Sequence, residues 1–287
     1  MTEKAYSYYP GCSLSSTARE YDVSTRLVFR TLGLELRELE DWNCCGASAT
    51  KSASHLLGLA LPARVLSLAE EAARPLTTPC PECYSRLRSA SYEMKDEATR
   101  LQVSEVLEKE VRNTVSVEPT LKIIWEYEGD LHIKKSLAGL KAVAYYGCLF
   151  VRPKAIAAFD DEENPRSLDE VTARLGVEML DWGFRSECCG AYLNVPKPEV
   201  VVRLVNRILR GAQQAGAECV VVACPLCQVN LDTRQRDAEG RYGVRLGLPI
   251  IYFTQLMGLA MGHSAQDLLL DKHLTDAMPL LRSKGLA

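Results

Sequence analysis

The sequence predicts an α/β fold made of two pseudo-symmetric half-domains, each with short parallel strands and flanking helices. Three observations support this prediction. A pattern of five cysteines occurs twice along the chain. Strand-like apolar runs alternate with helix-like segments, which is typical of folds with parallel sheets. Cys12, Cys80, Cys148 and Cys224 each follow a strand-like run, and functional sites of such sheets gather at the carboxyl ends of the strands.

The repeat can be read directly in the sequence. YYPGCS at Tyr8–Ser13 corresponds to YYGCLF at Tyr145–Phe150, and PCPECYSRL corresponds to ACPLCQVNL. The two halves read Cys-x31-Cys-Cys-x34-Cys-x2-Cys and Cys-x39-Cys-Cys-x34-Cys-x2-Cys, and their vicinal pairs lie 144 residues apart. We therefore expect half-domains at residues 1–138 and 139–262. A helical tail at residues 263–287 could dock on a partner.

The first half alternates strand and helix signals. We expect strands at Ala5–Tyr9, Leu34–Leu39 and Leu76–Thr78, and helices at Ala18–Leu32, Ser52–Ala73 and Tyr84–Lys109. Pro10-Gly11 ends the first strand, and Gly33 ends the first helix. Pro62 predicts a kink or break in the second helix, because proline lacks the backbone N–H. Val115–Tyr127 is expected to form a strand and then a helix.

The second half repeats this order. We expect strands at Lys141–Tyr146, Val177–Leu180, Cys219–Ala223 and Pro249–Phe253, and helices at Leu168–Leu175, Pro198–Gln214 and in TQLMGLAMG. The run CVVVA is apolar throughout, which is typical of a strand buried on both faces. The halves therefore predict two similar sheets.

Composition excludes several classes of protein. The 287 residues are 47% hydrophobic and 25% charged, as in ordinary globular proteins. A net charge of -3 gives no electrostatic basis for binding nucleic acid or an anionic membrane surface. No apolar run is long enough for a membrane span, and the N-terminus lacks the plan of a signal peptide. We therefore expect a cytoplasmic protein whose eleven cysteines bind metal or react, rather than form disulfides.

Ten of the cysteines form the repeated pattern. Thiolates are soft ligands that select zinc, copper(I) or iron–sulfur clusters. Adjacent cysteines seldom both bind one tetrahedral ion, but they suit a centre with several metal atoms. A zinc ion needs four ligands and each half offers five, so iron–sulfur centres are favoured. Structural zinc in the first half remains an alternative.

These two units resemble the CCG domain, and the whole chain resembles the B subunit of heterodisulfide reductase. The resemblance also covers NPRSLDE, PLCQVNLD and LPIIYFTQLMGLAMG. It implies a noncubane [4Fe-4S] cluster in each half and cleavage of a thiol-derived disulfide, such as the mixed disulfide of coenzyme M and coenzyme B. The implied first cysteine set is Cys12, Cys44, Cys45, Cys80 and Cys83. The implied second cysteine set is Cys148, Cys188, Cys189, Cys224 and Cys227.

The resemblance implies a disulfide oxidoreductase that is active only within a complex. The chain has no GxGxxG motif and no ferredoxin motif, so the expected partners are the ferredoxin-like C subunit and the flavoprotein A subunit of heterodisulfide reductase. Archaeal members tend to have histidine where this chain has Leu149, so a bacterial homologue acting on another thiol, in either direction, is an alternative. Two further alternatives are an electron-transfer subunit of another CCG-type oxidoreductase and a zinc-stapled interaction subunit of a sulfur-oxidation complex.

The remaining candidate residues have plain structural interpretations. Cys219 lies in a run of valines and is expected to be a core thiol. Arg152 and Lys154 follow the second lone cysteine, so they could bind an anionic group of a substrate, although such residues are more often only solvated. The four histidines share no spacing with one another and are expected at the surface or in the core, namely His55, His132, His263 and His273.

Overall fold

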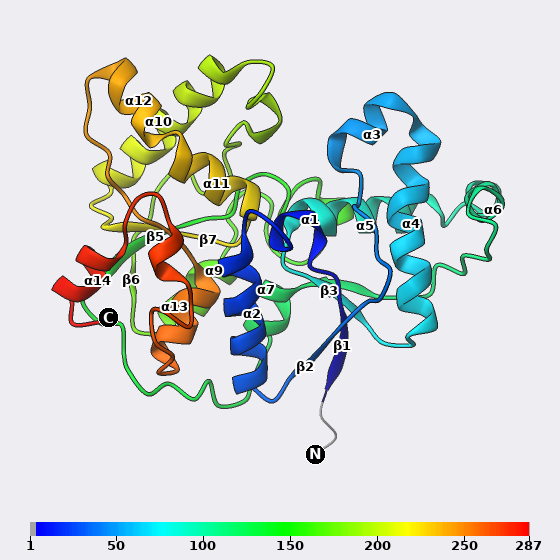
Figure 1. Cartoon of the computed structure of the whole chain (residues 1–287), viewed down its shortest axis with the longest axis horizontal. Helices are drawn as coiled ribbons and strands as arrows, with labels where there is room; N and C mark the ends of the chain where they lie inside the picture. Colours follow the sequence, from blue (N-terminus) through cyan, green and yellow to red (C-terminus); the bar gives the residue numbers. More distant parts are fainter. Residues whose placement is uncertain (1–3, 287) are drawn as a thin grey trace.

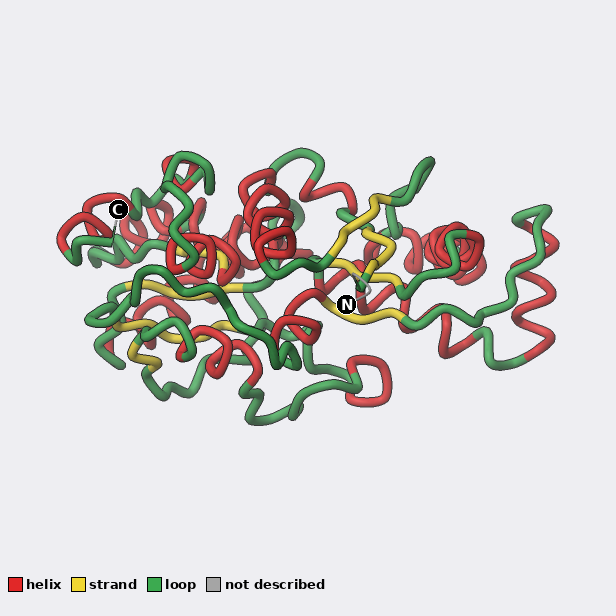
Figure 2. Tube along the Cα trace, turned by 90° about the horizontal axis from the view of Figure 1, so that it is seen from below, coloured by secondary structure: helices red, strands yellow, loops and turns green. Residues whose placement is uncertain are grey.

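A computed structural model describes residues 4–286 of the chain (Figure 1). It contains two four-stranded parallel sheets, ordered β2-β1-β3-β4 and β6-β5-β7-β8. Figure 2 shows helices on both faces of the sheets. The predicted α/β class, with one sheet in each half, is confirmed.

The first half supplies residues 5–125 of the regular structure. Its strands are β1 (Ala5–Tyr8), β2 (Glu35–Glu38), β3 (Leu76–Thr78) and β4 (Val117–Pro119). Its helices are α1 (Gly11–Leu14), α2 (Arg19–Thr31), α3 (Ala47–Ala53), α4 (His55–Glu71), α5 (Pro81–Glu93), α6 (Glu97–Val106) and α7 (Thr120–Trp125). The strand followed by a helix that we expected at the end of this half is present as β4 and α7.

The second half repeats the topology. Its strands are β5 (Lys141–Tyr145), β6 (Glu178–Met179), β7 (Cys219–Val222) and β8 (Ile250–Tyr252). Its helices are α8 (Lys154–Ala157), α9 (Ser167–Ala173), α10 (Pro198–Gln214), α11 (Pro225–Thr233), α12 (Gln235–Tyr242), α13 (Phe253–Ala260) and α14 (Met278–Ser283), with 3-10 turns at Ala191–Leu193 and Leu270–Lys272. All four residues of β7 are buried, as expected for the apolar CVVVA run.

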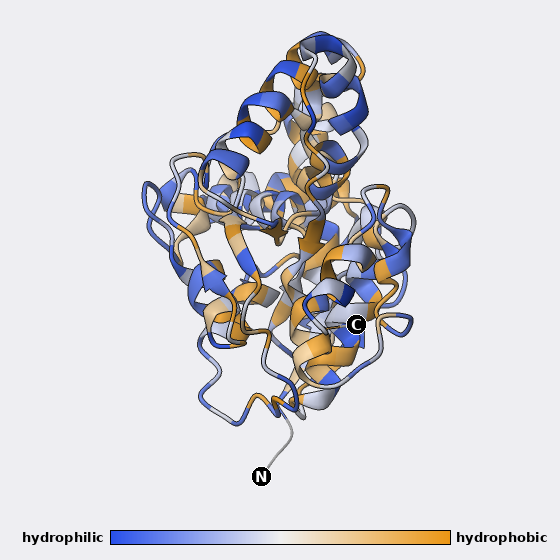
Figure 3. Cartoon of the chain, turned by 90° about the vertical axis from the view of Figure 1, so that its left-hand side faces the viewer, coloured by the Kyte–Doolittle hydropathy of each residue, from blue (hydrophilic) through white to orange (hydrophobic). Residues whose placement is uncertain are grey.

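Helices of the two halves pack against one another across the interface. Helix α2 of the first half packs against α13 of the second, and α9 of the second packs against α7 of the first. Ser24 Oγ and Thr254 Oγ1 form a hydrogen bond of 2.7 Å across the first of these contacts. Figure 3 shows apolar residues in the central strands and many polar residues on the outer helices. One hydrophobic cluster runs through both halves, and the boundary between residues 138 and 139 stays a prediction.

Two helix predictions need correction. The expected helix at Tyr84–Lys109 is two helices, because Asp96 caps a new one by accepting a hydrogen bond of 2.9 Å from Thr99 N. The expected helix at Ser52–Ala73 likewise begins anew after Ser54, which caps α4.

Of the kink or break expected at Pro62, the break is absent. Proline cannot donate to the carbonyl four residues earlier, which here is Gly58 O. Arg86 Nη2 donates to that carbonyl at 2.7 Å instead. The freed acceptor is therefore satisfied from α5, and α4 continues past Pro62.

The tail after residue 262 is less helical than expected. Only the turn at Leu270–Lys272 and the short α14 are helical, and the remainder is irregular. Leu268, Leu270 and Leu281 are buried against the same chain. Asp232 holds the tail by accepting hydrogen bonds of 2.8 Å from the backbone N–H groups of Leu274 and Thr275.

No helix within residues 4–286 combines the length and the apolar composition needed to cross a bilayer.

We expect Asp232→Asn to lower the free energy of unfolding by about 1–3 kcal/mol, because one backbone N–H group loses its hydrogen bond to a charged carboxylate. Urea denaturation measures this loss. The matched control is Asp271→Asn, which removes only an exposed, solvent-screened ion pair with Lys272 and should lower the free energy of unfolding less than Asp232→Asn does. Equal losses in the two variants would contradict this account of the tail.

Candidate metal centres

Both cysteine sets lie at the carboxyl ends of the strands. Cys12 lies in α1, just after β1, and Cys80 directly precedes α5 after β3. Cys148 and Cys224 occupy the corresponding places after β5 and β7. The vicinal pairs lie in the loops that follow β2 and β6. The predicted location beyond the strand ends is therefore confirmed.

The first set forms a row of neighbouring sulfurs. The Sγ atoms of Cys12 and Cys44 are 3.8 Å apart, and those of Cys45 and Cys83 are 3.5 Å apart. Cys83 also hydrogen-bonds to Cys80. Cys12 and Cys44 are exposed, whereas the other three are buried. The row thus runs from the surface into the interior.

The second set repeats this arrangement. The Sγ atoms of Cys189 and Cys227 are 3.6 Å apart. Cys148 hydrogen-bonds to Cys188, and Cys224 hydrogen-bonds to Cys227. None of the eleven cysteines, all of which the structure describes, forms a disulfide. Each half therefore brings its own five cysteines together.

The crowding of the sulfurs shifts their acidity in opposite directions. The hydrogen bond from Cys44, followed by that from Cys83, lowers the pKa of Cys45 to about 3. The hydrogen bond from Cys148 lowers the pKa of Cys188 to about 6. The donating partners, Cys44 and Cys148, have raised pKa values for the same reason. In each set a cysteine with a lowered pKa thus lies beside one with a raised pKa, and bound cations would favour loss of the remaining protons.

Two glycines make room for the inner sulfurs. Gly11 and Gly147 have φ values of +71° and +68°, in the left-handed region. A Cβ atom on Gly11 would lie 2.8 Å from Cys83 Sγ, and one on Gly147 would lie 2.8 Å from Cys227 Sγ. Any larger residue at either position would therefore collide with the sulfur.

A buried tyrosine supports each vicinal pair. Tyr9 Oη donates a hydrogen bond of 2.8 Å to Asn43 O, directly before Cys44. Tyr145 Oη donates one of 2.6 Å to Glu187 O, directly before Cys188. Sequence reasoning missed these tyrosines, although both occupy the same place before the lone cysteine in YYPGC and YYGC.

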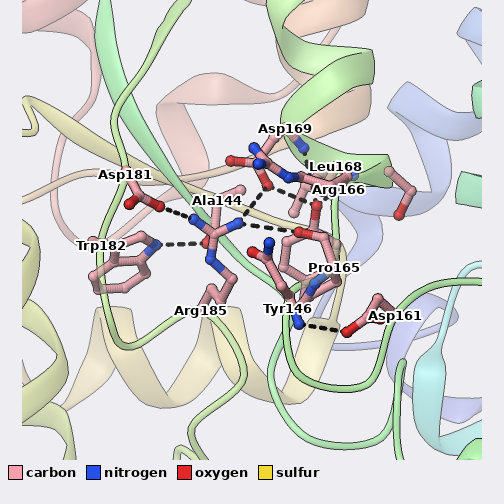
Figure 4. A network of polar contacts seen from close by, with 12 residues as sticks. Ala144, Tyr146, Asp161, Pro165, Arg166, Leu168, Asp169, Asp181, Trp182 and Arg185 are labelled. Carbon is pink, nitrogen blue, oxygen red and sulfur yellow. Dashed lines mark hydrogen bonds and ion pairs between the residues drawn. The ribbon is translucent and has the colours of Figure 1, made fainter.

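A buried polar network supports the second set alone (Figure 4). Tyr146 Oη donates to Asp169 Oδ2 at 2.7 Å, and Arg185 Nη1 lies 3.7 Å from the same carboxylate oxygen. Arg185 also pairs with Asp181, and its carbonyl accepts a hydrogen bond of 2.8 Å from Tyr146 N. Arg185 therefore ties the loop before Cys188 to the strand end before Cys148.

A small cavity reaches the second set from the interface between the halves. Its volume is ≈ 30 Å³, enough for a water molecule. It is lined by Pro81, Glu82, Tyr146, Cys148, Leu149, Cys188, Cys189, Ala191, Tyr192, Cys224, Leu226 and Cys227. All five cysteines of the second set thus face one cavity, and the first half contributes to its wall.

Glu82 is the charged residue of that wall. It belongs to the CxxC motif of the first half, and its carboxylate contacts the Tyr192 hydroxyl of the second half. Burial, followed by the nearby Cys45 thiolate, raises the pKa of Glu82 to about 7. Glu82 therefore lies between the two sets.

The other candidate residues lie outside both sets. Arg152 pairs with Glu163 at 3.1 Å, and Lys154 is exposed. Neither residue lines the cavity. Cys219 is fully buried in β7, and burial raises its pKa to about 12. His55 is exposed and pairs with Glu93, whereas His273 is buried and hydrogen-bonds to Gln255 at 2.9 Å. These positions agree with the structural interpretations.

The thiolate-rich donor sets fit a metal centre. Two thiolates bound about 2.3 Å from one tetrahedral metal atom lie about 3.7 Å apart. The Sγ–Sγ distances of 3.5, 3.6 and 3.8 Å are close to this spacing. Among residues 4–286, however, no three Cys, His, Asp or Glu side chains surround a single metal-ion position. The sulfurs meet in pairs, which suits a centre with several metal atoms better than one ion.

Comparison with known proteins identifies similar chains. The family model described as "Cysteine-rich domain", CCG, matches residues 6–88 and 142–232. The 8-methylmenaquinol:fumarate reductase membrane anchor subunit of Wolinella succinogenes is 32% identical, over 97% of this chain and 99% of that protein. The B subunit of the ferredoxin/F(420)H(2)-dependent CoB-CoM heterodisulfide reductase of Methanosarcina acetivorans is 26% identical, over 91% of both chains.

Two more comparisons agree with these. A protein of Archaeoglobus profundus named as similar to the heterodisulfide reductase B subunit is 27% identical over 90% of both chains. A hypothetical protein from Helicobacter pylori has the same fold, with a TM-score of 0.79 at 15% identity; the match covers 95% of this chain and 52% of that one. With two matched regions and relatives along its length, this chain belongs to the CCG cysteine-rich domain family and is a homologue of the heterodisulfide reductase B subunit.

Proposed function

We propose that the chain is the disulfide oxidoreductase subunit of a heterodisulfide reductase-like complex. In this proposal each cysteine set binds a noncubane [4Fe-4S] cluster, and a thiol-derived disulfide reacts at the second set. The cavity at the interface carries the proposal, because all five cysteines of that set line it together with residues of the first half. The homology to the heterodisulfide reductase B subunit supports it.

Iron–sulfur clusters are favoured over zinc by the number of ligands. Each set offers five thiols within one row, and a tetrahedral zinc ion uses four ligands. The pairwise sulfur contacts support a centre with several metal atoms in each half. Zinc in the first set remains the alternative that metal analysis must exclude.

When bound, the clusters would supply electrons and iron atoms with affinity for sulfur. Reduction of a disulfide consumes two electrons and two protons and yields two thiols. The cavity wall is mostly apolar, which suits a sulfur atom and limits entry of water. Glu82 and Tyr192 are the polar groups that could orient the rest of the substrate.

Electrons must reach the chain from other proteins. We propose the ferredoxin-like C subunit of the complex as the direct donor and the flavoprotein A subunit beyond it. The Methanosarcina relatives are named as subunits of ferredoxin-dependent reductases, which supports assembly into a complex. Cytoplasmic location belongs to the same proposal.

A second candidate function is electron transfer without a thiol substrate. The relative at 32% identity is named as part of a fumarate reductase, which favours a role in another CCG-type oxidoreductase. In that case the cavity would bind no thiol. The two candidates therefore differ at the second set.

Anaerobic metal analysis tests the clusters. We expect about eight irons per chain, and we expect Cys189→Ser to remove about four of them by dismantling the second cluster. Cys219→Ser is the matched control, because this thiol lies outside both sets and should leave the iron content unchanged. Zinc in place of four irons would show that the first set is structural, and zinc alone would refute the enzyme.

EPR spectroscopy separates the two candidate functions. After oxidation in the presence of a thiol, the disulfide oxidoreductase should show a new thiol-dependent signal. The signal should vanish in Cys189→Ser and persist in Cys219→Ser. If none of a panel of small thiols changes the spectrum, electron transfer is the better description.

Alkylation of the reduced protein tests which thiols bind metal. Without metal at pH 7, iodoacetamide should modify Cys188 rapidly, because Cys188 is exposed and its pKa of about 6 leaves it mostly ionised. Below pH 6 the rate should fall about tenfold per pH unit as the thiolate is lost. Cys219, with a pKa of about 12, should react only after unfolding. Peptide mass spectrometry measures the alkylation of Cys188 and of Cys219. Equal labelling of Cys188 with and without metal would contradict its role as a ligand.

A further inference from the structure

One tyrosine contacts the backbone directly before both CxxC motifs. Tyr21 lies in α2 and is fully buried. Its hydroxyl donates a hydrogen bond of 3.0 Å to Ala223 O, and it lies 3.4 Å from Pro79 O, a second acceptor. Ala223 directly precedes Cys224, and Pro79 directly precedes Cys80. The single hydroxyl proton is thus shared between the carbonyl that precedes Cys80 and the carbonyl that precedes Cys224.

The ring of Tyr21 is held from the second half of the chain. It stacks on Tyr252 with ring centroids 4.1 Å apart and an angle of 6° between the planes. Phe253 packs edge-on against it at 6.3 Å. One turn further along α2, Ser24 hydrogen-bonds to Thr254 at 2.7 Å. These contacts fix the direction of the Tyr21 hydroxyl.

Tyr21 differs from the other tyrosines near the cysteines. Tyr9 and Tyr145 each support the vicinal pair of their own half. Aligning LGLEL with LGVEM places Asn164, not a tyrosine, opposite Tyr21 in the repeat. Tyr21 lies between the two CxxC motifs, so this single tyrosine contacts the backbone before each of them.

We infer that Tyr21 is a positioning residue shared by the two cysteine sets, and that its hydroxyl fixes the CxxC loops relative to one another. The inference rests on the proposed function in that both sets bind a metal centre. Electron transfer between two centres and a common disulfide depends on their relative placement. A shared hydrogen bond at the base of both loops supplies that placement.

The test is Tyr21→Phe, which removes the hydroxyl and keeps the ring. It is made in two backgrounds that each keep one intact set, Cys45→Ser and Cys189→Ser. In both backgrounds we expect an altered EPR line shape and severalfold faster release of iron to a chelator. Three matched variants complete the series: Tyr9→Phe should act only in Cys189→Ser, Tyr145→Phe only in Cys45→Ser, and Tyr252→Phe in neither. The Tyr252 hydroxyl is buried without a hydrogen-bond partner among the described residues, so its loss breaks no hydrogen bond and keeps the ring that stacks on Tyr21.

An effect of Tyr21→Phe on one set alone would overturn the inference. So would a lowered melting temperature with unchanged spectra and release rates, which would indicate a residue that stabilises only the fold. Zinc in either set would refute the proposed function at that set, whereas zinc release from the same variants would still test Tyr21. A chain that binds no metal would overturn both.

Discussion

The structure depends on holding five thiols in contact at the end of each parallel sheet. Sulfurs at 3.5–3.8 Å cannot all ionise without positive charge between them, and the opposed pKa shifts of Cys44 and Cys45 show this constraint in the first half. The surrounding residues keep the sulfurs close in spite of it. Gly11 and Gly147 leave the space, and buried tyrosine hydroxyls fix the loops. The fold thus concentrates five thiols at the end of each sheet.

The two halves share a topology but surround their sulfurs differently. In the second half the buried Arg185 joins the segments that carry Cys148 and Cys188. In the first half Arg64, which pairs with the exposed Asp41, makes no corresponding link between the segments that carry Cys12 and Cys44 among the contacts of the described residues. The cavity with its apolar wall also lies at the second set. The two halves therefore hold similar sets of five thiols that differ in their surroundings and in their access.

Much of the fold could be predicted because it depends on local pattern. The two sheets, their parallel strands and the gathering of cysteines at the strand ends all follow from the repeat and from hydrophobic periodicity. The wrong predictions concern places where a contact between residues distant in the sequence determines the local structure. Pro62 stays within α4 because Arg86, from another helix, satisfies Gly58 O. Glu82 and Tyr21 escaped notice because each acts on the other half of the chain, and no spacing within one repeat reveals such contacts. For the candidate site, the pattern indicated which thiols belong together, and the tertiary structure supplied the cavity and the supporting hydroxyls.

The helices that pack between the two halves do so in two equivalent pairs. Helix α2 packs on α13, and α9 packs on α7, so each half covers an apolar face of the other in an equivalent way. A protein consisting of one half alone would leave both faces bare. Two identical copies would cover them in a two-fold symmetric pair, the commonest form of homo-oligomer. The two halves therefore meet as the copies of a two-fold symmetric homodimer would, and Glu82 and Tyr21 make contacts between the halves that depart from this symmetry.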